Sequence, residues 1–239
     1  NGLGEIYLEE DKRYSYTGIS NYKRVVLNEE QEKAKDIVVN SFGTANTYLL
    51  YGVTGSGKTE VYMSIIEEAL KLGKEAIMLV PEISLTPQVV GKFISRFGDV
   101  VAVLHSKLSD TERYDEYRKI TTGEAKIVIG TRSAIFVPFN NIGVIIIDEE
   151  HTSSYKQENH PRYNAKDIAM FRGKYNNIPV VLGSATPSLD SKARADKGVY
   201  TLLTLKNRVG SAILPTITVV DMEPEMKKRN MIFSDILVT

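Results

Sequence analysis

The sequence predicts an α/β fold in which a mostly parallel sheet carries helices on both faces. Short apolar runs rich in β-branched residues alternate with amphipathic stretches of helical length along most of the chain. The strand-like runs, such as Val144 to Ile147, are continuously apolar, which is typical of strands buried on both sides. Their alternation with helices favours parallel pairing.

The elements can be assigned in order from a first helix. Asn28, with Gln31 three places on, has the pattern of a capping box, so a helix should run from here to about Ser41. Further helices are expected at roughly 57–72, 87–97, 110–121 and 165–175. Strands are expected at 47–53, 76–81, 100–105, 125–131, 142–148 and 179–184, with two more near 200–205 and 216–221 that extend the sheet.

Length and composition fit one large α/β domain. The 239 residues include 42% hydrophobic and 25% charged side chains, as in ordinary globular proteins. We expect residues 27–239 to form this domain, and the polar segment 1–26 to be a linker or the tail of a preceding domain. Because the sequence stops within an apolar pattern at Leu237 to Thr239, we expect it to be a piece of a longer protein.

Charge and cysteine content exclude several classes of protein. Lys and Arg together number 30 and Asp and Glu also number 30, so if the protein binds nucleic acid, either its basic residues gather on one face or most of the binding lies elsewhere. The absence of cysteine excludes disulfides and cysteine-ligated zinc, and three histidines do not favour another soft-ligand metal site. No secretory signal or membrane-spanning run is present in the sequence, so we expect a cytoplasmic protein with no membrane partner.

The segment from Gly52 to Thr59 matches the phosphate-loop pattern G-x-x-x-x-G-K-[ST] in full. Its glycines allow backbone N–H groups to point at phosphate oxygens, Lys58 should reach the β- and γ-phosphates, and Thr59 should offer its hydroxyl to Mg²⁺. The expected nucleotide-binding residues are Gly52, Thr54, Gly55, Ser56, Gly57, Lys58 and Thr59. The alternative is a glycine-rich turn that binds nothing. Such a turn would not need to match the phosphate-loop pattern at every position.

Carboxylates follow the apolar strand that ends at Ile147. Asp148 is expected to hold Mg²⁺ through its water shell, and Glu149 to orient or deprotonate the attacking water. We expect this strand to lie beside the strand of the phosphate loop, so that Lys58, Asp148 and Glu149 form the catalytic group. The alternative is a solvated acidic loop.

These motifs resemble those of the superfamily 2 helicases. The similar segments are Gly52–Thr59 (motif I), Leu79–Thr86 (motif Ia), Gly130–Ala134 (motif Ib), Asp148–His151 (motif II), Gly183–Ser188 (motif III) and Leu27–Gln31, whose Gln31 would recognise adenine. The resemblance covers roughly residues 27–239. It implies a P-loop NTPase fold of the RecA-like type, the first of two motor lobes, with ATP and Mg²⁺ as cofactors.

Within that superfamily, the amino-acid sequences of residues 80–88, 130–139 and 148–157 are similar to those of helicases that restart stalled replication forks. This implies a 3′-to-5′ DNA helicase that couples ATP hydrolysis to movement along single-stranded DNA. The implied partners are single-stranded and forked DNA, a second RecA-like lobe and DNA-binding domains in the same full-length chain, and primosome and single-strand-binding proteins. Residues 1–26 would then lead from a DNA-binding domain.

The segment 151–164 interleaves aromatic and basic side chains, which suits single-stranded DNA because rings stack on bases while cations hold phosphates. The expected DNA-binding residues here are Tyr155, Lys156, Arg162 and Tyr163. The alternative is a surface loop whose tyrosines pack on the domain. By the resemblance, this loop would also report DNA binding to the ATP site.

Motifs Ia and Ib offer further contacts to the DNA backbone. Ser84, Thr86 and Gln88 could donate hydrogen bonds, and Arg132 could pair with a phosphate, although each could equally be a helix cap or a surface group. The mixed charges of 95–118 are more typical of a solvated helical face.

Two other functions stay open at this point: a module that binds nucleotide or DNA without hydrolysis, and a related translocase or RNA helicase. A helicase also needs a second lobe with an arginine finger. No late motif rich in Gln and Arg follows residue 190, so the chain alone should be a weak or inactive ATPase.

Overall fold

The computed structural model describes residues 25–209. Chain contacts group these described residues into one compact unit that ends at Val209. The expected strand at 216–221 and nearly all of the segment 1–26 lie outside the described residues.

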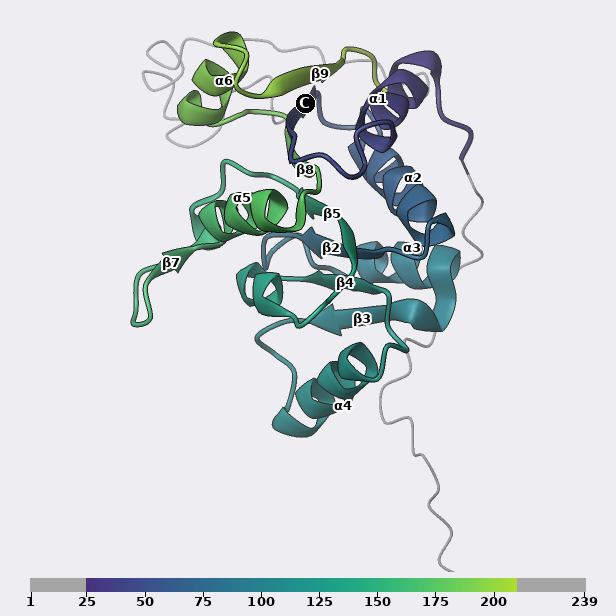
Figure 1. Cartoon of the computed structure of the whole chain (residues 1–239), viewed down its shortest axis with the longest axis vertical. Helices are drawn as coiled ribbons and strands as arrows, with labels where there is room; N and C mark the ends of the chain where they lie inside the picture. Colours follow the sequence, from purple (N-terminus) through teal and green to yellow (C-terminus); the bar gives the residue numbers. More distant parts are fainter. Residues whose placement is uncertain (1–24, 210–239) are drawn as a thin grey trace, which may run out of the picture. The chain divides into compact units, whose positions relative to one another are not determined.

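A parallel sheet forms the centre of the domain, with the strand order β3-β4-β2-β5-β8-β1-β9 (Figure 1). All neighbouring strands in this sheet pair in parallel, which confirms the predicted fold class. The strands are β1 (Thr47–Gly52), β2 (Glu75–Leu79), β3 (Val101–Leu104), β4 (Ile127–Gly130), β5 (Ile142–Ile147), β8 (Val180–Ser184) and β9 (Thr201–Leu205).

Helices begin close to the expected residues, and a capping side chain marks the first turn of each of them except the one that starts at Lys58. They are α1 (Glu29–Val39), α2 (Lys58–Lys71), α3 (Pro87–Phe97), α4 (Asp110–Thr121), α5 (Ala165–Asn176) and α6 (Leu189–Asp196). The capping box of Asn28 and Gln31 is present, and both α3 and α4 have the predicted bounds. Helix α6, which Ser188 caps, was not predicted. Among the described residues, no helix is long and apolar enough to cross a membrane.

Two apolar layers hold helices against opposite faces of the sheet, as predicted. Because alternate strand residues point to opposite faces, Met78 packs in the layer under α1, α2 and α3, whereas Ile77 and Leu79 pack in the layer under α4 and α5. Each fully buried aliphatic side chain contributes roughly 1.5–3 kcal/mol to folding. The strands therefore hold their carboxyl ends, and the loops that follow them, at fixed positions.

The segment between β5 and α5 is not a plain loop. After the 3₁₀ turn η3 (Ser153–Tyr155), β6 (Lys156–Gln157) and β7 (Tyr163–Asn164) pair antiparallel as a short hairpin that leads directly into α5. In Figure 1 this hairpin projects away from the main sheet. Two more 3₁₀ turns, η1 (Gly98–Val100) and η2 (Arg132–Phe136), follow α3 and β4.

Candidate functional site

The predicted phosphate loop connects β1 to α2, as its sequence context required. Gly55 and Gly57 both have φ of 81°, a conformation that glycine adopts without a steric cost. A side chain at Gly52 would force its neighbours to shift, because an added Cβ would lie 2.5 Å from Ser56 Oγ and 3.1 Å from Leu205 Cβ. Lys58 is buried, and its Nζ donates to the Gly52 carbonyl at 2.9 Å, so its ammonium group lies inside the curl of the loop.

Helix α1 brings Gln31 against this loop. Gln31 is 2% exposed, and its amide donates to the Ser56 carbonyl at 2.8 Å while accepting from the Asn28 N–H at 2.9 Å. The side chain therefore lies beside the phosphate loop, with both ends already bonded. Recognition of adenine by Gln31 stays a proposal.

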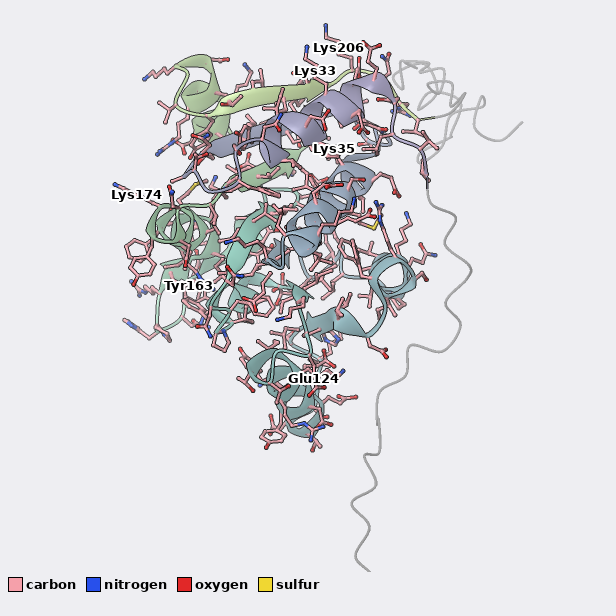
Figure 2. The ribbon with its side chains drawn as sticks, turned by 45° about the vertical axis from the view of Figure 1, so that its right-hand side comes forward. Lys33, Lys35, Glu124, Tyr163, Lys174 and Lys206 are labelled. Atoms are coloured by element: carbon pink, nitrogen blue, oxygen red, sulfur yellow. The ribbon has the colours of Figure 1, made fainter. Side chains whose placement is uncertain are left out.

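The segment after β9 also reaches the phosphate loop, which sequence reasoning missed. The Val209 N–H donates to the Gly55 carbonyl at 2.9 Å. The Lys206 N–H donates to the Glu30 carboxylate at 2.9 Å, which fixes the segment to the first turn of α1. Figure 2 shows Lys206 and Lys33 at the same end of the domain. No sequence motif marks this contact.

Asp148 lies at the carboxyl end of β5 and meets α2 directly. The buried Tyr62 hydroxyl donates to Asp148 Oδ1 at 3.0 Å, and Tyr62 lies one turn after Lys58 on the same helix. The structure therefore brings the phosphate loop and the first carboxylate of motif II to the same edge of the sheet. One expectation was wrong: β5 does not neighbour β1, because β8 lies between them.

The pKa of Asp148 is raised, first by burial and second by the neighbouring Glu149 carboxylate. The Tyr62 hydrogen bond and the Lys58 charge oppose that rise. Lys58 is thus close enough to stabilise the charged form of Asp148. A buried carboxylate that is only partly compensated in this way would gain from a cation.

Glu149 takes an unusual backbone conformation at the turn after β5. Its φ is 46°, a region that non-glycine residues rarely occupy. Its carboxylate lies 3.6 Å from His151 Nδ1, which in turn is 2.8 Å from the Ser184 hydroxyl of motif III. The turn therefore presents Glu149 beside Asp148 and joins it, through His151, to the end of β8.

Glu150, for which we predicted no role, is the most enclosed carboxylate of motif II. Its side chain is 0% exposed and pairs with Lys166 Nζ at 2.8 Å. It also accepts from Ser191 Oγ at 2.8 Å and from the Ser188 N–H at 2.7 Å. Burial alone would raise the pKa of Glu150, but the hydrogen bonds from Lys166, Ser188 and Ser191 outweigh it and lower the pKa.

Tyr155 does not fit the expected role of stacking on bases. It is 2% exposed, and its hydroxyl donates to the Asp148 carbonyl at 2.5 Å and to the Leu79 carbonyl at 3.2 Å. Burial also raises its pKa, so the hydroxyl keeps its proton. Tyr155 packs on the domain, which is the alternative that the sequence left open, and it holds the backbone of Asp148 against β2.

Tyr155→Phe should lower the free energy of unfolding by about 1–3 kcal/mol, because the Asp148 carbonyl loses its donor in a buried place. Urea unfolding of the variant measures this loss. Tyr114→Phe, at a position 68% exposed on α4, is the matched control and should change little. If the variant keeps its stability but binds single-stranded DNA more weakly, Tyr155 has the DNA-binding role that the sequence predicted.

The other hairpin residues remain on the surface. Lys156 and Arg162 are exposed; Lys156 pairs loosely with Glu158 at 3.6 Å, and Arg162 Nε donates to the Glu158 carbonyl. Tyr163 is half-buried and meets the Phe136 ring edge-on at 4.9 Å between centroids. Lys156 and Arg162 are therefore accessible at the hairpin, and DNA contacts by Lys156, Arg162 and Tyr163 stay proposals.

Arg132 anchors the hairpin from motif Ib. Its Nη1 donates to the Ser154 carbonyl at 3.1 Å and to the Lys156 carbonyl at 3.3 Å. A groove of about 380 Å³ lies alongside, and its lining includes Arg132, Tyr163 and Arg113 of α4. Arg113 belongs to the segment 95–118, whose mixed charges predicted a solvated helical face.

In motif Ia, Thr86 caps α3, since its hydroxyl accepts from the Val89 N–H at 3.4 Å. Ser84 is half-buried in the turn before it. Thr86 therefore has a structural role of the kind that the sequence left open, and DNA contacts by Ser84 and Thr86 stay proposals.

Comparisons with known proteins agree with this geometry. Residues 28–194 match the family model described as DEAD/DEAH box helicase. The replication restart protein PriA of Bacillus subtilis is 52% identical over 230 residues, which are 95% of this chain and 28% of that protein. PriA of Chlamydia pneumoniae is 48% identical over 213 residues, which are 87% of this chain and 28% of that protein. The resemblance to replication-restart helicases is thus confirmed, and this chain spans a little over a quarter of these relatives.

Solved structures give the same fold. A structure of RecG bound to a three-way DNA junction superimposes with a TM-score of 0.56 and 26% identity, covering 79% of this chain and 25% of that chain. The UvsW helicase of bacteriophage T4 superimposes with a TM-score of 0.54 at 18% identity, covering 79% of this chain and 62% of that chain. The second likeness shows the fold alone.

Proposed function

Because this chain belongs to the DEAD/DEAH box helicase family, we propose that it is the first motor lobe of an ATP-driven DNA helicase. The similarity to PriA supports a 3′-to-5′ motor in replication restart and primosome assembly, acting on single-stranded and forked DNA in the cytoplasm. The lobe would work with a second RecA-like lobe and DNA-binding domains of the same full-length chain, and with primosome and single-strand-binding proteins.

One observation carries this proposal: the phosphate loop and the motif II carboxylate share one rim of the sheet. Tyr62, one turn after Lys58, is hydrogen-bonded to Asp148. ATP phosphates between Lys58 and Asp148 would therefore meet an ammonium group, the N-terminal N–H groups of α2 and a carboxylate suited to a hydrated Mg²⁺.

The residues of the loop fit a bound triphosphate. Among the described residues, the Ser56 hydroxyl is buried without a hydrogen-bond partner, and Lys58 bonds only to a backbone carbonyl of the loop itself. Gly52, Thr54, Gly55, Gly57 and Thr59 complete the phosphate-binding set that we propose, and Gln31 would recognise adenine at its edge. Mg²⁺, held near Thr59 and Asp148, would neutralise charge on the phosphate oxygens.

Glu149 is the proposed group that orients the attacking water. It follows the metal carboxylate directly and is half-buried, and its charge helps to raise the pKa of Asp148, so the two carboxylates are close together. DNA would bind along the hairpin, through Lys156, Arg162 and Tyr163, and along motif Ib, through Arg132, with Ser84 and Thr86 as further backbone contacts. These contacts carry no base readout, so binding should be largely independent of sequence.

The test is phosphate release by the full-length protein, with and without single-stranded DNA. Lys58→Ala should lower ATP turnover by about ten- to a hundredfold, the effect of losing a hydrogen bond between charged groups worth ~1.5–3 kcal/mol. Lys71→Ala, at the exposed far end of the same helix, is the matched control and should turn over ATP normally. Turnover in Lys58→Ala equal to the wild type would show that this loop does not carry the hydrolysis, which would rule out the motor and leave the lobe as a module that binds without hydrolysing ATP.

A competition between single-stranded DNA and RNA for the stimulated protein separates a DNA helicase from a related RNA helicase or translocase. We expect DNA to stimulate turnover more strongly. The isolated chain should remain a weak or inactive ATPase, because the arginine finger of a second lobe typically contributes about 10³-fold or more to the rate.

A further inference from the structure

Glu150 forms a buried polar cluster that the proposed reaction does not itself use. Its two carboxylate oxygens accept hydrogen bonds from Lys166 Nζ, the Ser188 N–H, Ser188 Oγ and Ser191 Oγ, at 2.7 to 3.1 Å. A carboxylate removed from water is costly unless it is paired and fully hydrogen-bonded, and this one is both. Such a cluster holds its members in one arrangement.

The members of this cluster come from segments that lie apart in the sequence. Glu150 directly follows Asp148 and Glu149, and its own N–H donates to the Gly183 carbonyl of β8 at 3.0 Å. Ser188, the last residue of motif III, caps α6, and Ser191 lies in the first turn of that helix. One carboxylate therefore connects the acidic turn to the loop of motif III.

Lys166 connects the same carboxylate to the hairpin. It lies in the first turn of α5, and α5 begins at the residue after β7 ends. The Asn164 side chain, at the end of β7, accepts from the Lys166 N–H at 3.0 Å. A displacement of the hairpin would thus move the start of α5 and pull on Glu150.

The backbone of Glu149 is the part of the acidic turn that can move when the hairpin is displaced. Glu149 has φ of 46° and lies between Asp148, held by Tyr155 and Tyr62, and Glu150, held by the cluster. Such a conformation persists only where its surroundings impose it. A small shift of Glu150 would therefore reorient the Glu149 carboxylate.

We propose that Glu150 and Lys166 are positioning residues that transmit occupancy of the hairpin by single-stranded DNA to Glu149. This inference rests on the proposed function and adds the residues through which the two sites communicate. Neither residue contacts ATP or DNA; both act by setting where Glu149 lies.

The test uses full-length protein with Glu150→Gln, Lys166→Gln and the double variant, titrated with oligothymidylate while phosphate release is recorded. The stimulated maximal rate should fall by about 5- to 150-fold in each single variant, the range of typical couplings between sites. The DNA concentration at half-stimulation should change by less than about twofold, since the hairpin surface is intact. Lys174→Gln, at an exposed lysine on the same helix (Figure 2), is the matched control and should keep full stimulation.

The double variant separates positioning from a purely structural role. Lys166→Gln alone leaves a buried carboxylate unpaired, so its thermal midpoint should fall, and adding Glu150→Gln should restore part of that stability. Stimulation should stay low in the double variant and be no lower than in the worse single variant, because the pair acts as a unit.

Wild-type stimulation in both single variants would overturn the inference. Recovery of stimulation together with stability in the double variant would also overturn it, because the pair would then only support the fold. Either result would leave the Lys58→Ala test untouched, so a failure of this inference is distinct from a failure of the proposed function.

Discussion

Glu149→Gln should leave Mg·ATP binding intact while lowering the rate of hydrolysis by about 10²- to 10⁴-fold. Proton transfer by a positioned side chain contributes this much to catalysis. The substitution keeps the size and polarity of the side chain, so the phosphate loop and Asp148 remain in place. The expected signature is a loss in kcat with little change in the affinity for nucleotide.

The measurement pairs phosphate release by the full-length protein with the binding of a fluorescent ATP analogue. Glu124→Gln, at an exposed carboxylate beyond the end of α4 (Figure 2), is the matched control and should behave as the wild type. Weaker nucleotide binding in Glu149→Gln, with the rate at saturation unchanged, would assign Glu149 to binding and leave the attacking water without a base.

The sheet and its helices could be predicted because each is specified by local sequence. Strands buried on both faces must be continuously apolar, as β5 is, and helices such as α1 and α4 begin at capping boxes. Helix α6 was missed because it offers no apolar stripe: Leu189 is 90% exposed, and the only residue that is buried is Ser191. The strands β6 and β7, of two residues each, are too short to carry a period.

The phosphate loop was also predictable, since its chemistry lies within eight consecutive residues. The partners of the acidic turn were not. Tyr62 and Asp148 are separated by 86 residues, and only the packing of α2 on the sheet brings them together. For Tyr155 the local sequence was misleading. An aromatic residue beside cations suggests stacking on bases, whereas the Tyr155 hydroxyl binds two carbonyls in the interior.

The order of the strands in the sheet could not be predicted from the sequence either. Apolar strands of similar length carry little information about their neighbours, so the sequence did not show that β8 would lie between β1 and β5. That placement brings motif III between the phosphate loop and the acidic turn. Gly183, near the end of β8, therefore lies against both Tyr62 of α2 and Asp148 of the acidic turn.

Gly183→Ala should destabilise the domain, because its added methyl group makes the shortest contact found at any described glycine. An added Cβ would lie 1.5 Å from the Tyr62 hydroxyl oxygen, 2.7 Å from Tyr62 Cζ and 3.3 Å from Asp148 Oδ1. Tyr62 is 0% exposed, so its ring has no free space into which to move. Overpacking of this kind typically costs about 1–3 kcal/mol, and displacement of Tyr62 would also remove its hydrogen bond to Asp148.

Urea unfolding and ATP binding should therefore both weaken in Gly183→Ala. Gly91→Ala is the matched control: no atom lies within 4 Å of its added Cβ, and alanine favours helix α3, so stability should stay equal or rise by up to ~1 kcal/mol. Tyr62→Phe in the Gly183→Ala background removes the closest atom but leaves the ring carbon, so it should recover part of the lost stability. Wild-type stability of Gly183→Ala would show that α2 is not packed tightly against β8 at this point, and the Tyr62–Asp148 contact that places the phosphate loop and motif II at one rim would lose its geometric basis.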